Sequence, residues 1–93
     1  YLHHRGIFAW KQVQAGIWDP VRKVYKGFHG LRGVSDILGV LPNGKFFACE
    51  VKSPSGRVSE EQERFIAKVN EMGGRAIIAR SIEDVKVGLN GVF

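Results

Sequence analysis

Apolar and polar positions alternate most clearly between residues 33 and 52. Two apolar segments, 33–41 and 45–52, flank a short polar stretch, as in a pair of adjacent strands. In the second segment, alternation with a period of two assigns side chains to two faces: Phe46, Ala48, Glu50 and Lys52 on one, and Phe47, Cys49 and Val51 on the other. The pattern predicts a central β-hairpin.

The sequence Pro42-Asn43-Gly44 predicts the turn of this hairpin. Proline suits position i+1 of a type I turn, asparagine suits i+2, and glycine can take the left-handed conformation of a bulge. The result is a three-residue loop in which Leu41 pairs with Lys45.

The register of the hairpin follows from that pair. Counting back along both strands places Asp36 directly opposite Glu50, with both side chains on one face. A two-residue Asn-Gly turn would instead place Ile37 opposite Glu50 and send the two carboxylates to opposite faces. The proline before Asn-Gly favours the three-residue loop.

The remaining pattern predicts further strands and helices around the hairpin. Residues 7–14 have the aromatic and β-branched content of a first strand, and residues 21–32 have no clean period and indicate a loop or a short strand pair. The continuous apolar segment 75–80 is typical of a buried strand. Residues 82–89 predict a last amphipathic turn or helix, capped by Ser81.

A helix is expected between the hairpin and the segment 75–80. Ser59-Glu60-Glu61-Gln62 is a capping box, and Gly73 closes the helix. Helical spacing predicts one stripe facing the sheet: Gln62, Phe65, Ile66, Val69 and Met72. Gln62 could therefore cap the helix, reach a site on the sheet, or do both.

These elements predict an α/β fold in a single domain, residues 1–93. We expect a mixed sheet of about four strands, antiparallel through the central hairpin, with a right-handed parallel crossover to the strand at 75–80. Helices would cover its faces. With 93 residues and 44% hydrophobic content, the chain can bury a modest core.

Cysteine content and hydropathy indicate the cellular compartment of the protein. Cys49 is the single cysteine, which excludes an internal disulfide framework and a cysteine-based zinc site and fits a reducing compartment. On the face away from Glu50 it is expected to be a small core residue. No apolar run approaches a membrane span of about 18 residues. We expect an intracellular protein, in the cytoplasm of a bacterium or of a phage-infected cell, or in a nucleus.

The net charge of +5 is concentrated in the first third of the chain. Before Ser35 the chain has six basic residues and one acidic residue, Asp19. From Ser35 onward it has eight basic and eight acidic residues. Such asymmetry is typical of a polyanion partner, although a solvated basic face is an equal alternative. Membrane docking is disfavoured because no long amphipathic helix carries the charge. The basic residues expected to contact such a partner, DNA in particular if it is a nucleic acid, are Lys11, Arg22, Lys23, Lys26, Arg32 and Arg57.

Three charged residues interrupt the apolar hairpin, namely Asp36, Glu50 and Lys52. Two carboxylates that face each other repel unless a cation lies between them, and Mg²⁺ prefers oxygen ligands of this kind. Lys52 beside the ion could orient or deprotonate a water molecule. The alternative is a structural salt bridge in which the lysine pairs with both acids.

The order Asp36, Glu50-Val51-Lys52 and Gln62 resembles the D…ExK…Q signature of the PD-(D/E)xK nuclease superfamily. More narrowly, the chain resembles the virus-type replication-repair nuclease (VRR-NUC) domain. The segments that carry the resemblance are 33–39, 50–52, 56–59 with Gln62, and 73–74. It covers residues 30–85 well and the first thirty loosely.

The resemblance implies a restriction-endonuclease-like core and a role for each matching residue. Asp36 and Glu50, with the backbone carbonyl of Val51, would bind Mg²⁺ or Mn²⁺, Lys52 would position the attacking water, and the side chain of Gln62 would approach the site. No small-molecule cofactor is expected. Such nucleases usually carry a further acid on an N-terminal helix; here no acid precedes Asp19, so we expect that ligand upstream of Tyr1 or a site without it.

The resemblance also implies a substrate and an assembly. Stand-alone members are expected to be homodimers that cut branched DNA such as four-way junctions. The alternatives are a module that processes flaps or ends, and an inactive DNA-binding module of the same fold.

Overall fold

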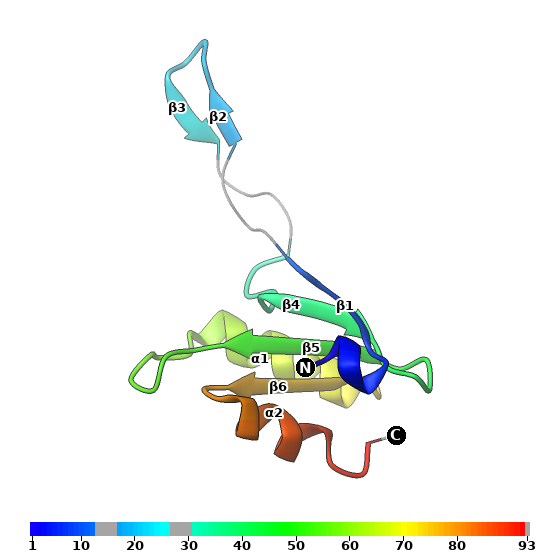
Figure 1. The fold of residues 1–93 in the computed structure, drawn as a ribbon. Helices are drawn as coiled ribbons and strands as arrows, with labels where there is room; N and C mark the ends of the chain where they lie inside the picture. Colours follow the sequence, from blue (N-terminus) through cyan, green and yellow to red (C-terminus); the bar gives the residue numbers. More distant parts are fainter. Residues whose placement is uncertain (13–16, 27–30, 93) are drawn as a thin grey trace.

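The computed structural model describes residues 1–12, 17–26 and 31–92, with the backbone alone at 17–19 and 24–26. Its main sheet has four strands in the order β1 (Phe8–Lys11), β4 (Ile37–Val40), β5 (Phe46–Val51) and β6 (Arg75–Ala79). β4 runs antiparallel to β1 and β5, whereas β5 and β6 are parallel. The predicted mixed α/β sheet is confirmed (Figure 1).

The central hairpin has the predicted three-residue loop. The Leu41 amide donates to the Lys45 carbonyl at 2.9 Å, and the Gly44 amide donates to the Leu41 carbonyl at 2.8 Å. Gly44 has a φ of 86°, which glycine adopts without a steric penalty. Ile37 pairs with Cys49, so the next position along places Asp36 opposite Glu50, as the turn chemistry predicts.

The first strand belongs to the main sheet, whereas the basic segment that follows it belongs to a second sheet. The predicted strand at 7–14 forms β1 at its first half, and residues 13–16 lie outside the described part. A second, two-stranded sheet pairs β2 (Ile17–Asp19) with β3 (Val24–Lys26). This hairpin stands away from the main sheet (Figure 1), and it shows the short strand pair that was one interpretation of 21–32, with its first strand earlier than expected.

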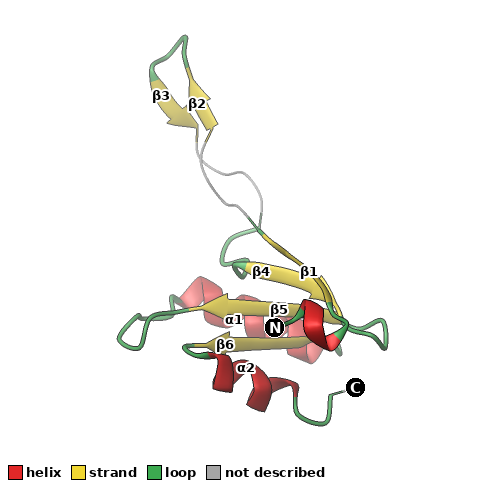
Figure 2. Ribbon diagram, viewed as in Figure 1, coloured by secondary structure: helices red, strands yellow, loops and turns green. Residues whose placement is uncertain are grey.

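Two α-helices lie on opposite faces of the sheet (Figure 2). α1 (Glu60–Glu71) begins with the predicted capping box and packs on β5 and β6. α2 (Ile82–Leu89) begins at Ser81, whose hydroxyl accepts from the Asp84 amide, and packs on β6. A short 3-10 helix, η1 (His3–Arg5), precedes β1.

The buried core lies mainly on the α2 face of the sheet. It consists of Ile7, Leu41, Phe47, Cys49, Ile77, Ala79, Val85 and Leu89. Cys49 is a core residue, as predicted, and burial, followed by the charges of Glu50 and Asp36, raises the pKa of its thiol to about 11. The thiol is therefore protonated near neutral pH and is a poor nucleophile.

The α1 face is less completely covered. The expected stripe on α1 is half-buried at Phe65, Ile66 and Val69, but Met72 is 74% exposed and does not continue it. The helix ends at Glu71, and Gly73, with a φ of 92°, turns the chain away at this point.

None of the helices in the described part of the chain combines the length and the apolar character that crossing a bilayer requires.

Candidate functional site

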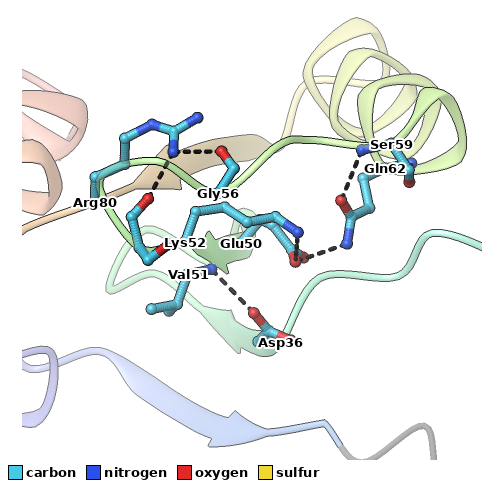
Figure 3. A network of polar contacts seen from close by, with 9 residues as sticks. Asp36, Glu50, Val51, Lys52, Gly56, Ser59, Gln62 and Arg80 are labelled. Atoms are coloured by element: carbon cyan, nitrogen blue, oxygen red, sulfur yellow. Dashed lines mark hydrogen bonds and ion pairs between the residues drawn. The ribbon is translucent and has the colours of Figure 1, made fainter.

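A buried carboxylate is the centre of the candidate site. Glu50 lies on β5, faces α1, and is 2% exposed. Its Oε1 accepts a hydrogen bond from Gln62 Nε2 at 2.8 Å and lies 3.6 Å from Lys52 Nζ (Figure 3). Its Oε2 is buried and has no hydrogen-bond partner among the described residues. Burying a polar atom without a hydrogen-bond partner costs free energy, and a ligand bound at Oε2 would remove that cost.

Asp36 is held opposite Glu50 by two backbone amides, one at the end of β5 and one just after β1. Its Oδ2 accepts from the Val51 amide at 3.1 Å, and its carbonyl accepts from the Gln12 amide at 2.6 Å. The amide and carbonyl of one residue in a strand point to the same neighbouring strand. The Val51 carbonyl is therefore directed to the side of the strand on which Asp36 lies.

Burial and the like charge of Asp36 determine how readily Glu50 ionises. Burial raises the pKa of Glu50 above its ordinary value of 4.5, the charge of Asp36 raises it further, and Lys52 opposes both. The effects that raise the pKa of Glu50 favour the neutral acid. A divalent cation at this carboxylate would therefore have to compete with a proton.

Lys52 follows Glu50 by two residues, and its side chain is 20% exposed. The expectation of a structural salt bridge required contact with both acids. Within the described part of the chain, the ion pair of Lys52 is with Glu50, while Asp36 takes a backbone amide instead. The ammonium thus lies at the edge of the site, where water can reach it.

Gln62 has both of the functions that the pattern allowed. Its Oε1 accepts from the Ser59 amide at 3.0 Å, and its backbone amide donates to Ser59 Oγ at 3.1 Å, which completes the capping box. Its Nε2 donates to Glu50, as described above. One side chain therefore ties the start of α1 to the buried carboxylate.

The donor set fits a hard divalent cation. Asp36, Glu50 Oε2 and the Val51 carbonyl supply oxygen atoms, and Mg²⁺ usually keeps several waters beside one or two carboxylates. The described residues contain no group of three or more His, Cys, Asp or Glu side chains suited to a metal ion. The protein ligands available here are therefore two carboxylates and a main-chain carbonyl.

Arg80 is a neighbour of the site that the sequence pattern did not single out. Its Nη1 donates to the Ser53 carbonyl at 2.7 Å and to the Gly56 carbonyl at 2.6 Å, so it holds the loop that follows Lys52 (Figure 3). Its backbone amide donates to Asp84 Oδ2 at 2.8 Å. The available signal was topological: the carboxyl ends of parallel strands meet at one edge of a sheet, and Arg80 directly follows β6.

The basic residues expected to contact DNA fall into two groups. Lys11 ends β1, Arg32 precedes Asp36 by four residues, and Arg57 follows the loop held by Arg80; all three are exposed and come from segments next to the site. Arg22 and Lys23 lie in the turn of the β2–β3 hairpin, away from the sheet (Figure 1). Lys26 ends β3, and its side chain lies outside the described part.

Comparison with protein-family models gives a match to the VRR-NUC domain over residues 5–83. The matched segment begins at η1 and ends in α2, so it spans the whole four-stranded sheet and the candidate site. Neither the curated proteins nor the solved structures compared with the chain include a match.

Proposed function

Because the chain belongs to the VRR-NUC domain family, we propose that it is a metal-dependent endonuclease that hydrolyses phosphodiester bonds of DNA. The observation that carries the proposal is the buried Glu50 Oε2, which lacks a hydrogen-bond partner and belongs to a carboxylate opposite Asp36. Lys52 lies beside the same carboxylate.

Each residue of the site has a distinct part in this reaction. Gln62 and Lys52 hold Oε1 of Glu50, which leaves Oε2 for the ion. Asp36, Glu50 Oε2 and the Val51 carbonyl would hold Mg²⁺ or Mn²⁺, which would supply stabilisation of the negative charge on the phosphoryl group. The Lys52 ammonium, partly exposed at the edge of the site, donates hydrogen bonds that orient the attacking water toward phosphorus.

The proposed substrate is branched DNA, such as a four-way junction, and the proposed assembly is a homodimer. Two sites related by a two-fold axis suit two symmetric cuts. The +5 net charge supports a nucleic-acid substrate. A module that processes flaps or ends, and an inactive DNA-binding module, are the competing possibilities.

Cleavage of labelled junction, flap and linear duplex DNA tests the proposal, with Mg²⁺, Mn²⁺ or EDTA. Glu50→Gln and Lys52→Ala should each lower the cleavage rate by about 100-fold or more, since preorganised charge is a large part of such catalysis. The matched control is the surface pair Glu83–Lys86, 3.4 Å apart on α2. Glu83→Gln and Lys86→Ala should cleave at the wild-type rate.

The outcomes separate the competing functions. Cleavage that survives both Glu50→Gln and Lys52→Ala would refute the site. DNA binding without cleavage by the wild-type protein, in either metal, would identify an inactive binding module. Preference for flaps or ends over junctions would replace the proposed substrate.

The assembly has its own measurement. Sedimentation at the assay concentration should give a species of twice the chain mass, and a monomer alone would contradict the homodimer.

A further inference from the structure

The α1 face of the sheet is covered over only part of its width. α1 packs on β5 and β6, and it lies behind these strands in Figure 1. The pairings Phe8 with Val40 and Val40 with Phe46 place these three side chains in one row across β1, β4 and β5. Phe46 shares the face of Glu50, since four residues separate them along β5. The row therefore lies on the same face as the candidate site.

This row lies at the end of the strands, where β1 and β5 begin and β4 ends, and its side chains are exposed. Phe8 is 70% exposed, Phe46 40% and Val40 38%. Trp10, in the next row on the same face, is 41% exposed, and its ring centroid is 5.4 Å from that of Phe8. We call Phe8, Trp10 and Phe46 the aromatic platform. Contiguous exposed apolar surface of this kind is typical of a binding site.

The platform leads directly to the carboxylates. Trp10 pairs with Leu38, and Leu38 with Ala48. The row that follows contains Asp36 and Glu50. Successive rows are about 7 Å apart, because each spans two residues of a strand. A ligand extended along the strands over the platform would therefore enter the site.

The surface beside the platform is basic. A cleft of about 930 Å³ between α1 and the strands is lined by apolar side chains that include Phe46 and Phe65. The charged residues of its lining are four cations and one acid: Arg32, Lys45, Arg64, Lys68 and Glu61.

Arg32 is placed at this cleft by its neighbour Gly33. Gly33 has a φ of 76° and lies so close to α1 that an added Cβ would overlap the main-chain carbonyl of Glu61. The close packing brings the loop that carries Arg32 onto the first turn of α1. The same turn contains Gln62, which bonds to Glu50. The basic cleft and the candidate site are therefore continuous.

We propose that the aromatic platform and the basic cleft bind an unpaired strand of DNA and lead it to the candidate site. Bases stack on Phe8, Trp10 and Phe46, and phosphates lie against Arg32 and Lys45. Exposed rings beside a basic groove are the usual combination for single strands, because every base has a face that can stack. The inference rests on the proposed function and narrows its substrate to branched DNA with unpaired nucleotides next to the cleaved bond, a condition that a four-way junction meets only where base pairs open at its branch point.

The charge of the cleft distinguishes this ligand from a second copy of the chain. A two-fold interface places one patch against the same patch of the other copy. Arg64 and Lys68 are paired with Glu60 and Glu71 on α1, so the cations that would meet their own duplicates are chiefly Arg32 and Lys45. Like charges in contact oppose association. A polyanion, in contrast, neutralises them.

The test is binding of a fluorescent single-stranded oligonucleotide in EDTA, compared with an abasic strand of equal length. Both strands carry the same phosphates, but only the first can stack. Trp10→Ala and Phe8→Ala should each weaken binding of the normal strand about tenfold, and leave binding of the abasic strand unchanged. Trp10→Phe should restore most of the affinity.

Tyr1→Ala is the matched control. Tyr1 is 40% exposed, close to the exposure of Trp10 and Phe46, but its ring lies near Lys86 of α2, on the other face. Its substitution should leave both affinities unchanged. Urea unfolding of each variant verifies that the platform variants remain folded at the assay temperature.

Two results would overturn the inference. One is an unchanged affinity for the normal strand in Trp10→Ala and Phe8→Ala. The other is a change from dimer to monomer in these variants with unaltered oligonucleotide affinity, which would assign the face to a second copy.

The proposed function can fail separately from this inference, because binding is measured without a divalent ion. Stacking-dependent binding without any cleavage would leave the platform in place and refute the nuclease. Normal cleavage with no stacking dependence would refute the platform alone.

Discussion

The two faces of the main sheet are built from alternate residues of the same strands, yet they differ in nearly every physical respect. On the α2 face, Phe47 and Cys49 are completely buried among apolar side chains. On the α1 face, their neighbours are the exposed Phe46 and the buried, charged Glu50. One face supplies most of the core, and the other keeps a carboxylate and aromatic surface that burial alone would not favour. The difference separates a face that supplies most of the core from a face that carries the candidate site.

The largest expected effect on stability is at Phe47, the largest fully buried side chain. Phe47→Ala removes a buried ring from the α2 face and should lower the free energy of unfolding by about 3–5 kcal/mol. Since small domains have only about 5–15 kcal/mol in total, the variant should be close to unfolding. Urea denaturation measures the change. A loss below about 1 kcal/mol would mean that this face is not the main core.

A smaller loss is expected at Gly33, where the loop meets α1. In Gly33→Ala, a residue with a Cβ has to adopt the left-handed conformation that glycine has here. The new Cβ would also overlap the Glu61 carbonyl. We expect a loss of about 2–3 kcal/mol in unfolding free energy, with weaker cleavage because the start of α1 moves. Gly44→Ala is the control, because its φ is also positive but its Cβ would meet nothing within 4 Å. Equal losses in the two variants would argue against close packing on α1.

The third effect is a pH dependence that belongs to the α1 face. Because the pKa of Glu50 is raised, the folded chain holds a proton that the unfolded chain has released above 4.5. In EDTA, stability should therefore fall as pH rises from 4.5 through the raised pKa. Glu50→Gln should remove this fall, and so should Mg²⁺ or Mn²⁺ in the wild type. Thermal melts between pH 4 and pH 8 measure it, and identical profiles for wild type and variant would contradict it.

The smallest expected change in unfolding free energy is at Phe8, which is a phenylalanine like Phe47. At 70% exposure, Phe8→Ala should change unfolding free energy by no more than about 0.5 kcal/mol. The pair of substitutions compares the two faces with one chemical change. A large loss at Phe8 would show that the α1 face also stabilises the fold, and the distinction between the faces would then be wrong.

Local chemistry explains the parts of the structure that sequence predicts well. The turn at Pro42-Asn43-Gly44 has one favourable conformation, and a period of two then places Asp36 opposite Glu50. The capping box of Ser59 and Gln62 is equally local. These features depend on residues within a few positions of each other, so their interpretation requires no knowledge of distant packing.

The features that sequence did not predict depend on distant segments. The exposure of Phe8 and Trp10 depends on which strands α1 covers, and an alternating pattern does not contain that information. Arg80 reaches the Ser53 carbonyl only because the crossover returns β6 beside β5. The pairing of Ile17–Asp19 with β3 was obscured by nearby turn residues. The roles of the site residues and the identity of the metal remain predictions.

The double function of Gln62 has a consequence for how the chain tolerates insertions. The start of α1 is set by the contacts of Gln62 with Ser59 and Glu50. In the loop before it, Gly56 is the last residue that Arg80 holds by a hydrogen bond. Residues inserted between Gly56 and Ser59 would lengthen the connection without moving the helix relative to the carboxylate. Loop length and site geometry can therefore vary independently, and that segment is a natural place to attach new recognition elements.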